Sequence, residues 1–293
     1  MKIVVSGGTG LIGNHLIQNY LQAHDVKILS TRKNIVADDL SYWNPEKNEL
    51  DQSLIDNADI IINLAGAPVS KRWTRSHKQL IKESRQNSTR TLVNACNASA
   101  KPKHFISASA IGYYGHTYSL VDEDSPSGND FLAKVCINWE EELKVLKPEH
   151  RLNIIRVGVV LAKEGGALNE MLKQFRRGLG SVLGNGRQKI SWIHIDDICR
   201  MMMFLINSSL DGRVYNAVAP NPVSNELLTK EVLDAFKLSS ILPPAPAFAL
   251  RLMLGEMSQI LLDSSNVSSK KIEDAGFEFK YCDLKSALES LRG

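Results

Sequence analysis

The feature that most constrains this 293-residue chain is a glycine-rich turn near its start. Residues 1–6 (MKIVVS) form a short apolar run typical of a buried strand, and residues 14–23 have the pattern of a helix. Between them, Gly7, Gly10 and Gly13 are spaced G-x-x-G-x-x-G. The order strand, glycine turn, helix is specific for a dinucleotide-binding fold, whereas the glycine pattern alone would be weak evidence.

Each glycine of such a turn has its own physical reason. One at the strand end permits the tight turn, a second leaves no Cβ between the backbone and a pyrophosphate, and a third lets the helix pack closely on the strand. The helix then presents free N–H groups and its positive dipole end to phosphates. A turn without any ligand is the alternative. The residues expected to contact the dinucleotide here are Gly7, Thr9, Gly10, Leu11, Ile12 and Gly13.

The end of the second expected strand, residues 25–30, bears on which dinucleotide is bound. Such folds usually place an acid there to bind the ribose 2′-hydroxyl of NAD. This chain has Ser30, Thr31, Arg32 and Lys33 instead, and none of these is a carboxylate. Because a guanidinium and hydroxyls suit a 2′-phosphate, we expect Ser30, Thr31 and Arg32 to favour NADP(H) over NAD(H). Arg32 as a solvated loop cation is the alternative.

Strands and helices continue to alternate through the first half of the chain. Further strands are expected at 41–43, 59–64, 103–109 and 152–157, and helices at 76–99 and 131–146. The alternation indicates an α/β fold, a Rossmann doubly wound parallel sheet. Later elements are less regular, with a helix at 166–177, a strand at 188–194 and a helix from Asp196. We expect a nucleotide-binding core over 1–160, to which 188–218 return, and a smaller C-terminal substrate-capping part over most of 161–293.

Composition excludes several functional classes. The net charge of +3 is not gathered into long runs, so neither nucleic acid nor a membrane surface is expected as a partner. No unbroken apolar stretch approaches the roughly 18 residues that a transmembrane helix needs. The four cysteines lack metal-ligand spacing, and the first strand leaves no room for a signal peptide. We expect a reduced, cytoplasmic protein with a small-molecule substrate, and a homodimer is one alternative for its oligomeric state.

Small residues follow the expected strand 59–64. Residues 65–68 read Ala-Gly-Ala-Pro, and side chains of this size let the backbone approach a ligand at the carboxyl edge of a parallel sheet. This part of the chain and the elements after it extend the expected cofactor site. The further contacts expected are Leu64, Ala65, Gly66, Ala67, Arg85 and Ser107.

Several motifs together carry a family resemblance. They are Gly7 to Gly13, Asn63-Leu-Ala-Gly-Ala-Pro68, Ser107-Ala-Ser109 with Tyr113-Tyr114-Gly115, Trp192-Ile-His-Ile-Asp-Asp197, Gly178-Leu-Gly180, Gly184-Asn-Gly-Arg-Gln188, Gly255-Glu256 and Gly276-Phe-Glu-Phe279. With them the chain resembles the extended short-chain dehydrogenase/reductases, and more narrowly the atypical epimerase family proteins whose C-terminal part is a domain of unknown function. The resemblance covers essentially the whole chain. It implies a Rossmann core that binds NADP(H), with a small-molecule site between core and cap, and it implies no known substrate.

The chain departs from this resemblance at the catalytic pair. Enzymes of the superfamily use a serine, together with a tyrosine four residues before a lysine that lowers the tyrosine pKa. Ser109 matches the serine, and it would hydrogen-bond the substrate oxygen. At the places of the tyrosine and the lysine stand Leu132 and Cys136, and a shift by one residue gives Phe131 and Val135. No phenol or paired amine is present in either register.

Other residues are candidates for the missing proton donor. Tyr113 and Tyr114 follow the fifth expected strand, at the mouth of the cofactor crevice, and packing beneath the cap is the alternative for both. Cys136 is a weaker candidate, because a buried structural cysteine is more common. His194 titrates near neutral pH in principle, and a satisfied structural histidine is its alternative.

Arginine and tryptophan side chains are the substrate candidates. Arg72 and Trp73 follow the loop after strand 59–64, and such a pair suits an anionic or aromatic substrate through charge-assisted bonds and stacking. The resemblance adds Arg187 and Trp192 to the same pocket. Arg156, at the end of the sixth expected strand, is instead expected to be an ion-pair partner inside the protein.

Two functional hypotheses of different classes follow. The first is an NADP(H)-dependent oxidoreductase or epimerase-like enzyme acting on a small, in one version anionic, substrate, with Ser109, Tyr113 and Tyr114 as the catalytic candidates. The second is a catalytically silent NADP(H)-binding sensor or scaffold, which the missing tyrosine–lysine pair favours. A nucleotide-sugar epimerase in the strict sense is the weakest hypothesis, because those enzymes rely on that pair.

Overall fold

The computed structural model describes residues 1–33, 38–240 and 242–292. The chain divides into two compact units that are interleaved along the sequence. Unit 1 comprises Met1–Tyr113, Phe131–Arg156 and Cys199–Tyr215, and unit 2 comprises Tyr114–Asp130, Val157–Ile198 and Asn216–Gly293. Each unit is described by itself below.

Unit 1 is built on a seven-stranded sheet with the order β11-β7-β5-β4-β1-β2-β3. The strands are β1 (Lys2–Ser6), β2 (Asp25–Ser30), β3 (Leu40–Tyr42), β4 (Ile60–Asn63), β5 (His104–Ala110), β7 (Arg151–Val157) and β11 (Arg213–Ala217). The pairings from β3 through β2, β1 and β4 to β5 are all parallel. Because β2 and β4 flank β1 on opposite sides, the strand order reverses there, and such a switch point is where doubly wound folds bind ligands. The expected Rossmann architecture is confirmed.

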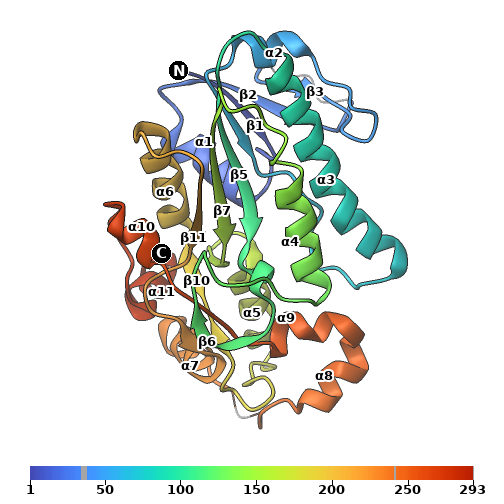
Figure 1. Ribbon diagram of the computed structural model, residues 1–293. Helices are drawn as coiled ribbons and strands as arrows, with labels where there is room; N and C mark the ends of the chain where they lie inside the picture. Colours follow the sequence, from blue (N-terminus) through green and yellow to red (C-terminus); the bar gives the residue numbers. More distant parts are fainter. Residues whose placement is uncertain (34–37, 241, 293) are drawn as a thin grey trace. The chain divides into compact units, whose positions relative to one another are not determined.

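Helices cover both faces of this sheet (Figure 1). One face carries α2 (Gln52–Asn57), α3 (Arg75–Ala98) and α4 (Phe131–Glu141), and the other carries α1 (Leu11–Tyr20) and α6 (Ile195–Asn207). The α1 and α6 helices touch where the Cys199 thiol lies 4.0 Å from the carbonyl oxygen of Ile12.

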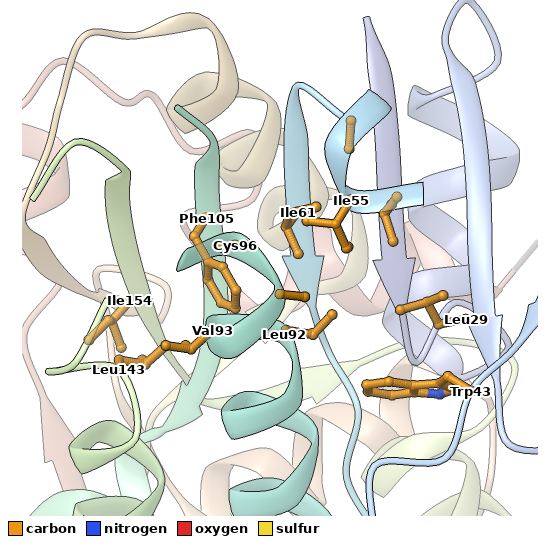
Figure 2. Packing of buried hydrophobic residues seen from close by; sticks show 13 residues of the cluster. Leu29, Trp43, Ile55, Ile61, Leu92, Val93, Cys96, Phe105, Leu143 and Ile154 are labelled. Carbon is orange, nitrogen blue, oxygen red and sulfur yellow. The ribbon is translucent and has the colours of Figure 1, made fainter. Parts of the chain in front are cut away.

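The hydrophobic core of unit 1 lies between the sheet and the face covered by α3. Figure 2 shows Ile61 of β4 and Phe105 of β5 packed with Leu92, Val93 and Cys96 of α3. All five side chains are fully buried. Each buried side chain of this size contributes about 1.5–3 kcal/mol relative to exposure, so this cluster fixes the position of α3 on the sheet.

Unit 2 contains short strands and several small helices. Its two-stranded sheets pair β10 (Trp192–His194) with β8 (Val159–Leu161), β12 (Val223–Ser224) with β9 (Lys189–Ile190), and β13 (Ser265–Val267) with β6 (Thr117–Val121). Its helices, apart from the start of α6, are α5 (Gly166–Phe175), α7 (Asn225–Ala235), α8 (Ala247–Leu254), α9 (Gln259–Leu262), α10 (Lys270–Asp274) and α11 (Leu284–Arg292). Two 3₁₀ turns, η1 (Ile111–Tyr114) and η2 (Gly255–Ser258), complete the described elements.

The elements differ from the sequence-based expectations in a few places. Helix α1 begins at Leu11 rather than residue 14, because Gly10 takes the extended backbone of an N-cap. The expected strand 188–194 is interrupted at Ser191, whose hydroxyl donates to Ser265 O and accepts from Val267 N–H. Strand β6 was not expected from the sequence. It pairs with β13, which lies far along the chain.

The expected division into a nucleotide-binding core and a substrate-capping part assigns functions to parts of the chain, and it stays a prediction. The described residues contain no helix that is both long and apolar enough to cross a membrane.

Candidate functional site

The glycine turn between β1 and α1 has a backbone that other residues would disturb. Gly7 has φ of +73°, and a Cβ there would lie 2.6 Å from the carbonyl carbon of Leu64. A Cβ on Gly13 would lie 2.5 Å from the carbonyl oxygen of Gly7. The Gly10 N–H donates to Gly7 O at 2.9 Å and closes the turn. The two glycines therefore let the turn, the β4 loop and helix α1 approach one another closely.

The first turn of α1 is open to a ligand. Its N-cap, Gly10, has no side chain with which to cap the helix N–H groups. Thr9 and Gly10 are exposed, while Leu11 and Ile12 are half-buried. Free N–H groups at the positive end of a helix bind phosphate oxygens, so these residues fit the pyrophosphate of a dinucleotide.

A buried hydrogen-bond network joins the carboxyl ends of β1 and β4 beneath this turn. The Ser6 hydroxyl donates to Asn63 Oδ1 at 2.7 Å, and Asn63 Nδ2 donates to the Thr89 hydroxyl of α3 at 2.8 Å. Trp139 Nε1 of α4 donates to the same hydroxyl at 2.8 Å. Satisfied buried networks hold their members rigidly, so the strand ends that carry the ligand loops are fixed.

The loop after β4 rests on α3. Arg85 donates through Nη1 to the carbonyl oxygens of Ala67 and Ile81, at 3.0 Å each. A Cβ on Gly66 would lie 3.0 Å from Cζ of Arg85, so a larger residue would press against the guanidinium. Burial lowers the pKa of Arg85 from its usual value. The structure thus shows Arg85 supporting the loop Leu64 to Ala67, and its contact with a cofactor stays a prediction.

The remaining predicted cofactor residues lie at the ends of β2 and β5. Ser30 is buried, and its hydroxyl accepts a hydrogen bond from the Arg32 N–H at 3.2 Å. Thr31 and Arg32 are exposed, which leaves the Arg32 guanidinium accessible to an anion. Ser107 is fully buried within β5, and its hydroxyl donates to Ala108 O at 3.1 Å.

A cluster of polar side chains forms around Ser109 at the carboxyl end of β5. The Ser109 hydroxyl donates to Glu140 Oε1 of α4 at 2.6 Å. Arg156 of β7 donates to both oxygens of that carboxylate, through Nε at 2.9 Å and Nη2 at 2.8 Å. The Arg156 guanidinium also stacks on the Tyr113 ring, with Cζ 3.5 Å from the ring centroid. Two predicted catalytic residues, Ser109 and Tyr113, are thus connected through a buried ion pair.

The α4 positions that correspond to the missing tyrosine–lysine pair are apolar and packed. A Cβ on Gly112 would lie 3.4 Å from Cβ of Leu132 and 3.8 Å from Sγ of Cys136. Burial, with a smaller effect of the Glu140 charge, raises the pKa of Cys136 to about 12. Cys136 therefore stays a neutral thiol at physiological pH, and it is unsuited to exchange protons.

Tyr114, the third predicted catalytic residue, belongs to unit 2. Its ring is buried and its hydroxyl donates to Asn216 Oδ1 at 2.7 Å. The Asn216 N–H in turn donates to the carboxylate of Glu123, whose pKa is raised mainly by burial. The phenol proton is thus already engaged in a structural network.

The predicted substrate residues of unit 1 differ in exposure. Arg72 is exposed, while Trp73 is half-buried and donates through Nε1 to Val69 O at 2.9 Å. The Trp73 ring also meets Phe131 edge-on, with centroids 4.9 Å apart. Trp73 therefore anchors its own loop, and a substrate contact of either residue stays a prediction.

Unit 2 contains a polar cavity of about 680 Å³. Its lining includes residues from the segment after η1, the 128–130 and 184–188 loops, α8 and α9. Gln188 belongs to the lining, and its amide nitrogen donates to the carbonyl oxygens of Leu183 and Leu261 at 3.0 Å each. Arg187 is exposed and lies outside the lining, as does Trp192, whose buried indole donates to Asn221 O at 3.1 Å.

Charged groups of both signs line this cavity. Burial raises the pKa of Asp263, and the nearby charge of Asp130 adds to the increase. His116 Nδ1 lies 3.6 Å from Asp263 Oδ1 and accepts a hydrogen bond from the Ser264 N–H at 2.9 Å. A cavity of this volume is of the size that holds small molecules.

His194 has a structural environment. It is buried, its Nδ1 accepts a hydrogen bond from the Asp196 N–H at 3.0 Å, and its ring stacks on Tyr281 with centroids 3.9 Å apart. These contacts agree with the alternative of a satisfied structural histidine. Among the described residues, no group of three or more His, Cys, Asp or Glu side chains is arranged to hold a metal ion.

Sequence reasoning missed the role of Glu140. In the sequence, Glu140 lies eight residues after Leu132, the residue at the place of the catalytic tyrosine. The sequence of α4 alone does not indicate that the Glu140 carboxylate reaches β5 and β7. Arg156, however, was expected as an internal ion-pair partner, and the structure confirms this expectation.

Comparisons with known proteins agree with this architecture. Residues 3–217 match the model of the NAD dependent epimerase/dehydratase family, and residues 245–291 match a domain of unknown function, DUF1731. The chloroplastic SDR39U1 homologue of Arabidopsis thaliana, an epimerase family protein, is 37% identical over 99% of this chain and 86% of its own length. An epimerase family protein of Staphylococcus aureus is 36% identical over 99% of this chain and 98% of its own.

A solved structure is similar over the whole chain. The human epimerase family protein SDR39U1 (isoform 2), solved with NADPH, superposes with a TM-score of 0.90 at 28% identity, and the match covers 100% of this chain and 99% of that one. Sugar-nucleotide epimerases below 25% identity share the fold, for example the UDP-glucuronic acid 4-epimerase of Bacillus cereus with a TM-score of 0.80. On the matched length and identity, this chain belongs to the NAD-dependent epimerase/dehydratase family, among its epimerase family proteins.

Proposed function

We propose that this chain is an NADP(H)-dependent enzyme of the extended short-chain dehydrogenase/reductase type, which oxidises, reduces or epimerises a small molecule. The cofactor part of the proposal draws on family membership and on the human relative that was solved with NADPH. It also draws on the open first turn of α1 and on the exposed Arg32 where an NAD-binding acid would stand. When bound, the nicotinamide would supply or accept a hydride.

The observation that carries the catalytic part is the Ser109–Glu140 hydrogen bond of 2.6 Å. It places a hydroxyl and a carboxylate at the carboxyl end of β5, in the same unit as the dinucleotide turn. Reactive groups of doubly wound folds gather at that edge of the sheet. Because apolar residues in place of such a buried polar cluster are often neutral or stabilising, the presence of the cluster at this edge supports a chemical role.

The substrate is proposed to be a small molecule. The cavity of about 680 Å³ in unit 2 supports this size class. The exposed guanidinium of Arg72 in unit 1 supports the anionic alternative for the substrate.

A second candidate function is an NADP(H)-binding sensor or scaffold without catalysis. The packing of Leu132 and Cys136 against η1 favours it, because these positions hold no group that can exchange a proton near neutral pH.

The test begins with titration of the purified protein with NADPH and with NADH, followed by nicotinamide fluorescence. A panel of metabolites is then added to the tighter complex. Tight NADPH binding together with oxidation of the cofactor by a panel compound supports the enzyme and defines its substrate class. If NADPH binds tightly but no compound is turned over and no compound changes the affinity, the result supports neither chemistry nor sensing. Only a scaffold would then remain. A metabolite that changes affinity without turnover supports the sensor.

A further inference from the structure

The direction of the hydrogen bond between Ser109 and Glu140 constrains what Ser109 can do. A carboxylate only accepts hydrogen bonds, so the hydroxyl proton of Ser109 points toward Glu140 Oε1 at 2.6 Å. Within residues 1–33, 38–240 and 242–292, this is the only hydrogen bond of that hydroxyl. The lone pairs of Ser109 Oγ therefore accept no bond from the described residues, and the residue is 3% exposed.

A serine in this state is suited to an alcohol and unsuited to a carbonyl. A substrate carbonyl needs a hydrogen-bond donor, and the Ser109 hydroxyl already donates its hydrogen bond to Glu140. A substrate hydroxyl carries its own proton and can donate it to the free lone pairs of Oγ. Ser109 thus stands between a substrate hydroxyl and a carboxylate that can receive a proton.

We propose that Glu140 is the proton acceptor of this enzyme, working through Ser109, and that the pair replaces the missing tyrosine and lysine in the oxidation of a substrate alcohol. This inference rests on the proposed function. Ser109 touches the substrate and is the catalytic residue, while Glu140 acts through it.

The proposed step balances in atoms and charge. The substrate hydroxyl passes its proton to Ser109 Oγ while the Ser109 proton moves to Glu140 Oε1, so serine is regenerated and Glu140 becomes neutral. The carbon–hydrogen bond of the alcohol carbon breaks, and its hydride goes to oxidised NADP, which becomes NADPH. The substrate leaves as a carbonyl compound, and Glu140 later returns its proton to water.

The surroundings of Glu140 hold it in position for this transfer. Arg156 binds both carboxylate oxygens, and the side chains of Arg156 and Glu140 are only 4% and 12% exposed. Stacking on Tyr113 at 3.5 Å fixes the guanidinium from its other side. We therefore regard Arg156 and Tyr113 as positioning residues, which keep one carboxylate oxygen directed at Ser109.

Several titratable groups face Glu140 from the elements around it. Arg156 lies on β7, Cys136 on the same helix α4, and Lys144 shortly after that helix. Cys136 stays a neutral thiol at physiological pH, and a carboxylate such as that of Glu140 can accept a proton whereas a guanidinium cannot.

Four variants test the proposal. Glu140→Gln keeps the volume and removes the proton acceptor, and Ser109→Ala removes the relay. The double variant combines both changes. Glu142→Gln is the matched control, because Glu142 also forms an ion pair with an arginine, Arg90 (Nε to Oε2 2.9 Å), and its Oε1 accepts from Gln86 Nε2 at 3.3 Å. Thermal unfolding and NADPH fluorescence titration verify that each variant folds and binds the cofactor.

The assay follows NADPH formation from NADP⁺ with a panel of secondary alcohols and polyols, over a range of pH. We expect Glu140→Gln to lower kcat about 10²–10³-fold with little change in KM, as general base removal does. Because the pair acts as a unit, the double variant should be no slower than the slower single variant. The loss of rate on acidification should disappear in Glu140→Gln, and Glu140→Asp should recover part of kcat.

Turnover of an alcohol by the parent, with Glu140→Gln within about threefold of the parent rate, would overturn the inference and leave the proposed function intact. Losses that multiply in the double variant would also overturn it, since independent residues would then be acting. If the parent binds NADPH and no compound is turned over in either direction, the proposed function itself fails and the inference falls with it.

Discussion

The turn between β1 and α1 and the cluster around Ser109 lie in the same unit, yet they are encoded in different ways. The turn is specified by glycines within seven consecutive residues, and its requirement is a backbone that approaches Leu64 without a Cβ. The Ser109 cluster joins β5, α4 and β7 through side chains that are 31 and 16 residues apart in sequence. The first kind of site is determined by neighbouring residues in the sequence. The second forms only when the strands and helices have assembled.

From this difference we expect the largest loss of stability when a residue of the Ser109 cluster is replaced. Arg156→Leu should destabilise the fold by about 3–5 kcal/mol, because it leaves the carboxylate of Glu140 buried without its partner. The free energy of unfolding in urea measures this loss.

The pair between Arg90 and Glu142 is the control. The Arg90 side chain is 50% exposed, so Arg90→Leu should cost at most about 1 kcal/mol. Equal losses for the two arginine variants would mean that the Ser109 cluster has no special dependence on burial, and the contrast between the two regions would weaken.

The same contrast explains what the sequence could predict. The parallel sheet and its helices follow from apolar runs and glycines, and the expected strand 25–30 has the observed bounds of β2. The partner of Ser109 could not be predicted, because the missing tyrosine and lysine draw attention to Leu132 and Cys136 whereas the proton acceptor is four residues farther along α4. Strand β6 escaped for a similar reason, since its exposed residues pair with β13 only through the tertiary fold.

A second prediction separates backbone strain from steric contact in the glycine turn. Gly7 and Gly178 have nearly the same φ, +73° and +74°, but a Cβ on Gly7 meets backbone atoms at 2.6 Å while a Cβ on Gly178 meets nothing within 4 Å. Alanine at either position should cost about 1–2 kcal/mol for its left-handed backbone. Gly7→Ala should in addition weaken NADPH binding about 100-fold, because the turn must shift away from Leu64.

Fluorescence titration with NADPH measures both variants. Unchanged affinity for Gly7→Ala would show that the close approach of the turn to the β4 loop is not needed for the cofactor. A loss of affinity as large in Gly178→Ala would show that global strain, rather than local contact, controls binding.

A third prediction concerns Arg32, the local feature from which the choice of NADP(H) was read. Arg32→Asp should weaken NADPH binding about 10–100-fold, the range expected for loss of a charge-assisted bond, and should leave NADH binding nearly unchanged. The ratio of the two dissociation constants is the measurement. Equal losses of affinity for the two cofactors would mean that Arg32 does not contact the 2′-phosphate. The prediction of NADP(H) from Arg32 would then be wrong.

The smallest effect is expected at His104, at the amino end of β5, which also depends on distant partners. Its Nε2 lies 2.7 Å from Asn153 Oδ1, and Arg151 donates to its Nδ1. Both contacts suit the neutral ring, and burial lowers the His104 pKa to about 4 from 6.5. The unfolded chain therefore takes up a proton near its pKa of about 6.5, which the folded protein does not until about pH 4.

The contribution of His104 to stability is thus complete above pH 6.5, and it is lost progressively as the pH falls toward about 4. His104→Gln, which stays neutral, should flatten the dependence of Tm on pH in this window. Urea unfolding at several pH values gives the free energies. A parent protein as stable at pH 4.5 as at pH 7 would show that β5 tolerates a charge at its amino end. The distant contacts of His104 would then constrain the fold less than those of Ser109 at the other end of the same strand.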